Sequence, residues 1–155
     1  PVPRRYPVVV AGCAPYDVDW WQSFKGAFCG DLLAADGGTL ILVTAAPEGN
    51  STYPLVPGFA GRDPAALRAE IEAGAVTDVK QAVGGVQIGR LRERLRLSLV
   101  SDGMTPADAS AMKIDWFPTV EEAVETAVGR LPAGERAGSV AVIPHAGIVL
   151  PILSG

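Results

Sequence analysis

The sequence is poor in the residues that usually build metal centres and disulfide frameworks. Its 155 residues include two cysteines and one histidine. Cys13 and Cys29 do not have the spacing of a metal-binding C-x-x-C pair, and two thiols do not make a disulfide framework. Reduced thiols are typical of the cytosol, so we expect a cytoplasmic protein with no metal ligands of its own.

Strong charge of one sign and long apolar runs are also lacking. The formal net charge is −4 with both signs mixed, which gives no field that attracts nucleic acid or an anionic membrane. No segment reaches the roughly 20 apolar residues of a membrane span, and no signal peptide precedes the first expected strand. We therefore expect no nucleic-acid or membrane partner. The length allows one core of ordinary size.

What the chain does contain is four short runs of valine, isoleucine and leucine. They cover residues 6–11, 39–44, 96–100 and 139–143. Near-continuous apolarity is typical of parallel strands that are covered on both faces. With helical patterns between them, the sequence predicts an α/β fold: a Rossmann-like three-layer sandwich with a mainly parallel central sheet.

Capping residues and periodicity indicate the helices between these strands. Asp63 before a proline and Thr119 before two glutamates are typical of helix starts. Thr77 predicts a short helix that ends at Gly84-Gly85, with a separate helix after it. A stripe of large apolar residues with four-residue spacing predicts one core-facing helix side: Trp20, Phe24, Phe28 and Leu32.

A cation and an amide follow the first strand after a short loop. Gln22 and Lys25 are three residues apart, so they project to the same side of a helix. The carboxyl ends of the strands are the edge at which open α/β sheets bind ligands. Spacing by itself favours a solvated helix face, and neither the G-x-G-x-x-G nor the P-loop motif follows the strand.

The stretch Trp21-Gln22-Ser23-Phe24-Lys25-Gly26, in this order of strands and loops, resembles the C-terminal domain of the nickel-pincer-dependent lactate racemase family. These enzymes racemise or epimerise 2-hydroxy acids. In that family the matching glutamine and lysine line a cleft between two domains. The resemblance implies that Lys25 and Gln22 are the catalytic contacts of this chain and that Trp21, where an aromatic residue is expected, contacts the cofactor.

The resemblance also implies the chemistry. An ammonium group at Lys25 would hold the substrate carboxylate or polarise the developing carbonyl, and Gln22 would add an oriented hydrogen bond. The hydride passes to the nickel pincer, a pyridinium bisthiocarboxylic acid mononucleotide nickel, and two histidines handle the hydroxyl proton. Since this chain has one histidine, those groups and the cofactor tether are expected on an N-terminal domain of the same polypeptide. The isolated chain is expected to be inactive and to hold neither nickel nor cofactor.

The first residues fit that division of the polypeptide. The sequence opens on Pro1-Val2-Pro3-Arg4-Arg5 without a methionine. We expect residues 1–5 to be the remnant of an interdomain hinge and residues 6–155 to be the C-terminal α/β domain of a two-domain enzyme.

Three further features fall near the same edge of the expected sheet. His145 follows the last strand and is a second candidate for a cofactor contact, although a lone histidine is more often structural. Cys13 ends the first strand, where a buried thiol usually acts as a small apolar residue. The polar segment 47–53 follows the second strand and is expected to act as a lid or cleft wall.

A run of alternating arginines is expected to be a solvated helix surface rather than a phosphate site, with Glu93 as a local partner: Arg90, Arg92, Arg94 and Arg96. Gly84-Gly85-Val86 lies where some family members have an aromatic residue at the cleft, so the substrate preference is expected to differ from lactate. A non-catalytic α/β ligand-binding or structural module is the alternative function. A nucleotide-sugar or acyl-phosphate enzyme rests on fold analogy alone.

Overall fold

The computed structural model describes residues 2–50 and 56–154. Within them a five-stranded, all-parallel sheet has the order β4-β3-β2-β1-β5. Its strands are β1 (Tyr6–Gly12), β2 (Ala34–Thr44), β3 (Arg96–Ser101), β4 (Asp115–Phe117) and β5 (Val140–Ile143). The α/β fold and the parallel sheet predicted from the sequence are thus confirmed.

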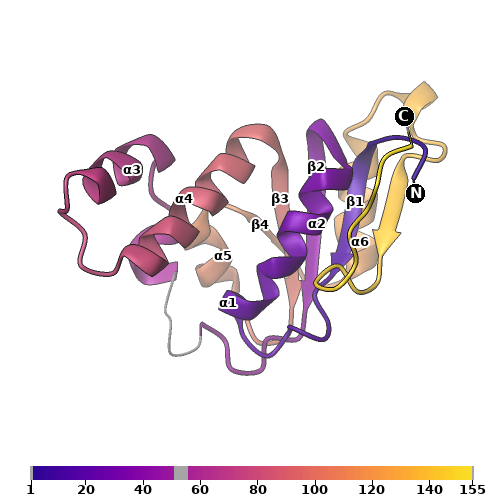
Figure 1. Cartoon of the computed structure of the whole chain (residues 1–155). Helices are drawn as coiled ribbons and strands as arrows, with labels where there is room; N and C mark the ends of the chain where they lie inside the picture. Colours follow the sequence, from indigo (N-terminus) through magenta and orange to yellow (C-terminus); the bar gives the residue numbers. More distant parts are fainter. Residues whose placement is uncertain (1, 51–55, 155) are drawn as a thin grey trace.

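Helices cover both faces of this sheet (Figure 1). On one side lie α1 (Trp20–Ser23), α2 (Lys25–Leu33), α4 (Val79–Arg94) and α5 (Pro106–Met112), with α3 (Pro64–Glu72) and a π-helical turn (Val56–Ala60) packed against α4. On the other side α6 (Val120–Gly129) packs against β1 to β4, and a 3-10 turn (Ala133–Glu135) follows it. These layers form the expected three-layer sandwich.

The strands are apolar on both sides because each side faces a separate core. Val8 and Val10 of β1 pack with Ala123 and Ala127 of α6. Val9, the residue between the two valines, belongs to the larger cluster under α2 and α4. Alternating side chains of one strand therefore reach opposite layers, which is why the sequence pattern shows continuous apolarity.

The chain reverses its direction of progress across the sheet at β1. From β1 it proceeds through β2 and β3 to β4, and β5 then returns to the free side of β1. Such a reversal is the switch point at which open α/β sheets bind ligands outside the carboxyl ends of their strands. In Figure 1 this edge is the lower one, where α1 lies.

One predicted helix boundary is wrong. The segment that was expected to break at Gly84-Gly85 is a single helix, α4, and Asp78 rather than Thr77 caps it by accepting a hydrogen bond from the amide of Gln81. Gly85 serves close packing instead: a Cβ at this position would lie 2.7 Å from the Cβ of Phe59. Glycine therefore lets the π-helical turn approach α4.

The predicted apolar stripe is half right. Trp20 and Phe24 are buried, but Phe28 and Leu32 are 44% and 40% exposed, so the second half of the stripe faces the surface. The start of β2 also differs, since the strand begins at Ala34 instead of residue 39. Two short elements, α5 and β4, were not expected from the sequence.

The arginine run is a solvated surface only in part. Arg92 donates hydrogen bonds to the carbonyl oxygens of Ala60, Arg62 and Met112, and burial lowers its pKa. Arg94 pairs with Asp31 and Asp36. These two side chains tie α4 to the π-helical turn, to α5 and to α2, so the expected pairing with Glu93 is not the one observed.

The two ends of the described chain lie side by side (Figure 1). Val2 forms a parallel bridge with Leu153; its amide donates to the carbonyl of Ile152, and its own carbonyl accepts from the amide of Ser154. Val2, in the segment expected to be a hinge, is therefore held against the C-terminal segment. No helix of the described residues is long and apolar enough to cross a membrane.

Candidate functional site

The loops after β1 and β5 meet at the switch point. The amide of Ala146 donates to the carbonyl of Gly12 at 2.8 Å. A Cβ on Gly12 would lie 2.3 Å from the carbonyl oxygen of Pro144, so only glycine permits this approach of the two backbones. His145 lies between these contacts and is exposed. The structure thus places it at the expected sheet edge.

Helix α1 is fixed to the carboxyl end of β2. Asp19 caps it by accepting a hydrogen bond from the amide of Gln22 at 2.6 Å. The hydroxyl groups of Ser23 and Thr44 are hydrogen-bonded at 2.6 Å. The buried rings of Trp20 and Phe24 anchor the same segment. Residues that follow these anchors are therefore held at a defined place on the edge of the sheet.

Lys25 and Gln22 form one polar pair on this segment. The Nζ of Lys25 donates to the Oε1 of Gln22 at 2.6 Å and lies 4.2 Å from the centre of the Tyr16 ring. Phe24 keeps a right-handed helical conformation between α1 and α2, so the three-residue spacing brings the two side chains together as expected. Tyr16 belongs to the loop after β1, and the ammonium group is consequently on the strand-end side of the molecule.

Tyr16 also connects this pair to the loop after β5. A Cβ on Gly147 would lie 2.6 Å from a carbon of the Tyr16 ring, so the ring packs directly on that backbone. The ring is 37% exposed. It therefore lies between Lys25 and the loop that carries His145. Sequence reasoning missed Tyr16, because only the folded loops bring it under the ammonium group.

A cavity of about 150 Å³ lies beside the pair, between α1, α2 and α4. Lys25 and Trp21 line it together. The ammonium group of Lys80 lies over the Trp21 ring, 5.1 Å from the ring centre. The remaining lining residues are Phe24, Phe28, Gly84 and Gln87. Since glycine stands at position 84, no side chain from that turn of α4 fills the space.

A second cavity, of about 320 Å³, lies at the carboxyl ends of β1, β2 and β3. Cys13 is among its lining residues, but its thiol does not offer a nucleophile. Burial raises its pKa to about 12, and the carboxylate of Asp17 adds to the effect. Burial also raises the pKa of the Cys29 thiol. Both cysteines are therefore protonated at neutral pH, in agreement with the apolar role expected for Cys13.

The polar segment 47–53 is described up to Asn50, and residues 51–53 lie outside the described residues. Its first part is tied to the segment after β1. The amide of Glu48 donates to the carbonyl of Val18, and the carbonyl of Gly49 accepts from the amide of Trp20. The side-chain Nδ2 of Asn50 donates to the carboxylate of Asp108. Residues 48 and 49 thus hold the start of α1 in place through these backbone hydrogen bonds.

The donor set for a metal is not formed by the part of the chain that the structure describes, where no group of three or more histidine, cysteine, aspartate and glutamate side chains converges. His145 is exposed at the sheet edge. The described residues thus do not form the ligand set of a nickel centre.

The comparisons with known proteins agree with this fold. The chain is similar, with a TM-score of 0.74 and 19% identity, to the lactate racemase apoprotein from Thermoanaerobacterium thermosaccharolyticum. The match covers 97% of this chain and 36% of that one, so the chain spans about a third of the length of the solved structure. No curated protein matches the chain. A family model described as the lactate racemase C-terminal domain matches residues 5–150. The chain therefore belongs to the lactate racemase C-terminal domain family.

Proposed function

We propose that this chain forms one wall of the active-site cleft in a nickel-dependent racemase or epimerase of 2-hydroxy acids, and that Lys25 clamps the substrate carboxylate. The observation that carries the proposal is the position of the ammonium group. It lies beside Gln22 and over Tyr16, on the strand-end side of an α/β sheet whose chain reverses there.

The pair has the hydrogen-bonding capacity that a carboxylate needs. Lys25 is exposed, and its ammonium group has three donors, of which one is directed at Gln22. Two donors are left for a ligand. Because the Oε1 of Gln22 accepts from Lys25, its side-chain Nε2, which donates to no other described residue, can donate to the same ligand. Charge-assisted hydrogen bonds of this kind are short and strong, and the Tyr16 ring holds the cation in place.

The nickel pincer cofactor of this family would supply the hydride acceptor. Its ligands and tether, and the histidine pair, are proposed to lie on an N-terminal domain, with residues 1–5 as the connection and residues 6–155 as the present domain. For this chain we propose only binding and orientation of the substrate. Trp21 lines the cavity beside Lys25 and His145 lies across the switch point, and both are proposed as cofactor contacts. The cytoplasmic location stays a prediction.

The test is the Lys25→Ala variant of the full-length protein, assayed by chiral chromatography with a panel of 2-hydroxy acids. Loss of a charged donor to the reacting substrate is expected to lower turnover by about 100-fold. Because Lys25 is exposed, the free energy of unfolding is expected to change by less than about 0.5 kcal/mol. Lys113→Ala, at an exposed lysine after α5, is the matched control.

Near-normal racemisation by Lys25→Ala would remove Lys25 from the site. Full-length protein that binds 2-hydroxy acids through Lys25 but racemises none of them would contradict the proposed reaction. The non-catalytic binding module would then be the better description.

A further inference from the structure

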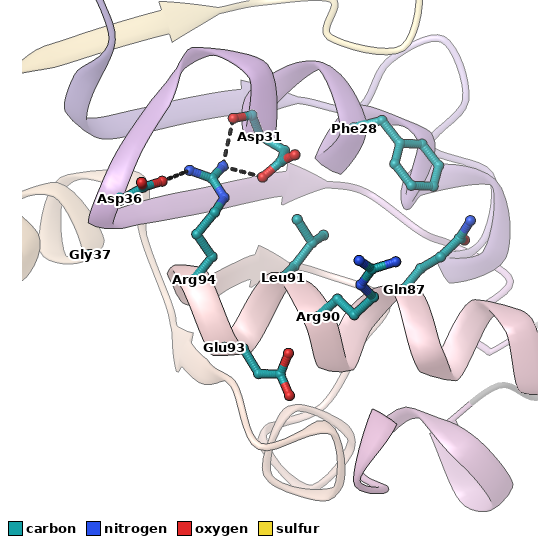
Figure 2. A pocket seen from close by; sticks show the side chains of 9 residues that line it. All are labelled: Phe28, Asp31, Asp36, Gly37, Gln87, Arg90, Leu91, Glu93 and Arg94. Atoms are coloured by element: carbon teal, nitrogen blue, oxygen red, sulfur yellow. Dashed lines mark hydrogen bonds and ion pairs between the residues drawn. The ribbon is translucent and has the colours of Figure 1, made fainter. Parts of the chain in front are cut away.

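The cavity beside Lys25 continues into a larger one between α2 and α4. This larger cavity has a volume of about 750 Å³ and is open to the surface (Figure 2). Phe28 and Gln87 line both cavities. The two spaces therefore form one groove, which we call the α2–α4 groove. It begins at Lys25 and Gly84 and runs along both helices toward Asp36 and Arg94.

Arg90 is the unpaired cation of this groove. It forms no hydrogen bond or ion pair with any residue in the described parts of the chain, whereas Arg92 and Arg94 are both engaged. Figure 2 shows the side chains of Gln87 and Arg90 rising from α4 toward Phe28 of α2. A guanidinium group offers five donors in a planar fork that suits a carboxylate, and Gln87 adds an amide.

The middle of the groove is apolar. Phe28 is 44% exposed, although the sequence pattern places it on the core side of its helix. Its ring lies between the Lys25 end and the Arg90 region, because it lines the cavities of both. When an apolar part of a ligand covers an exposed ring in a concave site, the burial of apolar surface makes binding more favourable.

The far end of the groove offers an anion little net charge. Asp31 and Asp36 both pair with Arg94, and Arg5 donates to the carbonyl oxygens of Asp31 and Ala34 at the same place, so the two cations balance the two carboxylates. Glu93 also lines the larger cavity but points away from Phe28 and is not paired with Arg90 (Figure 2). A second acidic group of a ligand is therefore attracted to Arg90, which pairs with no carboxylate among the described residues. This arrangement favours a second acidic group at Arg90 over one farther along the groove.

We infer that the substrate is a 2-hydroxy acid with a second acidic group at its far end, joined to the first by a short apolar segment. This inference rests on the proposed function for the carboxylate at Lys25. Arg90 and Gln87 bind the second acid, and Phe28 covers the segment between. Gly84, beside Lys25, and Arg90 are six positions apart on α4, which is about 9 Å along the helix axis. The side chains of Lys25 and Arg90 are long enough to reach toward each other over this distance and bind the two carboxylates of one ligand.

Binding of simple acids to the full-length protein tests the inference, with isothermal titration calorimetry as the measurement. The probes are glutarate, which has two carboxylates, and butyrate, which has one. We expect glutarate to bind the wild-type protein about fivefold to tenfold more tightly than butyrate, the effect of one partly exposed charge-assisted contact. Arg90→Gln is expected to bring the two affinities to within about twofold.

Arg68→Gln is the matched control, since Arg68 is an exposed arginine on α3 whose partner is Glu72. This variant is expected to keep the preference for glutarate. Equal affinities in the wild-type protein, or an unchanged preference in Arg90→Gln, would overturn the inference. A circular-dichroism melt of each variant checks that it is folded.

The same experiment separates this inference from the proposed reaction. If Arg90→Gln abolishes the preference for glutarate but the full-length protein racemises no 2-hydroxy acid, the dicarboxylate site stands and the racemase proposal fails. If monocarboxylic 2-hydroxy acids are racemised and glutarate is not preferred, the racemase proposal stands and the dicarboxylate site fails.

Discussion

The Nζ of Lys25 lies 2.6 Å from the Oε1 of Gln22, and the backbone N–H of the same Gln22 donates to the capping carboxylate of Asp19. The cap and the pair therefore share one residue. Ser23, next in the chain, is hydrogen-bonded to Thr44 at the end of β2. The helix cap at Asp19 and the contact between Ser23 and Thr44 thus hold the segment with Gln22 and Lys25 at a fixed place on the sheet edge.

The Gln22→Glu variant tests the pair directly. A carboxylate at this place would neutralise the ammonium of Lys25 and repel a substrate carboxylate, so we expect the KM of the full-length enzyme for 2-hydroxy acids to rise about tenfold. Gln22→Ala removes a hydrogen bond but leaves the charge of Lys25, and a smaller rise is expected. An unchanged KM in Gln22→Glu would mean that the substrate carboxylate does not bind at this pair.

The isolated 155-residue chain is expected to show no racemase activity and to bind no nickel in stoichiometric amount. Its one histidine, His145, cannot supply a base on both faces of a substrate. The described residues also lack a converging set of metal ligands. Chiral chromatography and elemental analysis check the two expectations, with the full-length protein prepared in the same way as the control. One nickel ion per isolated chain would contradict the proposed division between two domains.

Arg90 and Arg92 are expected to respond differently to the same substitution. Arg92 donates to three backbone carbonyl oxygens from a half-buried position, and its removal leaves these acceptors without a partner. We expect Arg92→Ala to lower the free energy of unfolding by about 2–4 kcal/mol. Arg90→Ala is expected to change it by less than about 0.5 kcal/mol. Urea denaturation measures both.

Arg92→Lys keeps the charge and part of the hydrogen bonding, so this variant is expected to fold even if Arg92→Ala does not. Its free energy of unfolding should lie between those of the wild type and Arg92→Ala. Equal losses for the Arg90 and Arg92 alanine variants would contradict the structural role of Arg92.

The fold was predictable where burial on two sides leaves a continuous apolar run. Residues 8–11 and 40–43 are such runs, and they lie in β1 and β2, two central strands of the sheet. β4, by contrast, is a three-residue edge strand that is only partly buried, and so has no pattern of that kind. Gly84-Gly85 was misread because glycine can serve close packing inside a helix as well as end it.

The site was predictable only where it is local. Gln22 and Lys25 lie one helical turn apart, so spacing alone brings them together. Tyr16, Gln87 and Arg90 reach the same region through the loop after β1 and through α4, and such contacts across the fold have no signature in a single sequence. The arginine run was misjudged for the same reason, since its partners are distant in the chain.

The thiol of Cys13 gives a prediction about pH. Its pKa is raised from 9.0 to about 12, mainly by burial. Between these values the unfolded chain has released the proton while the folded chain still holds it, so the free energy of unfolding falls as the pH rises. Between the two pKa values this thiol lowers the free energy of unfolding by about 1.4 kcal/mol per pH unit. Below pH 9 the thiol adds no pH dependence, because it is protonated in both the folded and the unfolded chain.

Comparison of the wild type with Cys13→Ala isolates this effect, because every other ionisable side chain is the same in both proteins. Denaturation between about pH 8 and pH 11 should give a difference in unfolding free energy that is constant up to about pH 9. Above that pH the wild type should lose stability faster than the variant, at roughly the slope of one proton. Parallel curves over the whole range would mean that the thiol is accessible to water in the folded protein, and the burial of Cys13 under the switch point would then be wrong.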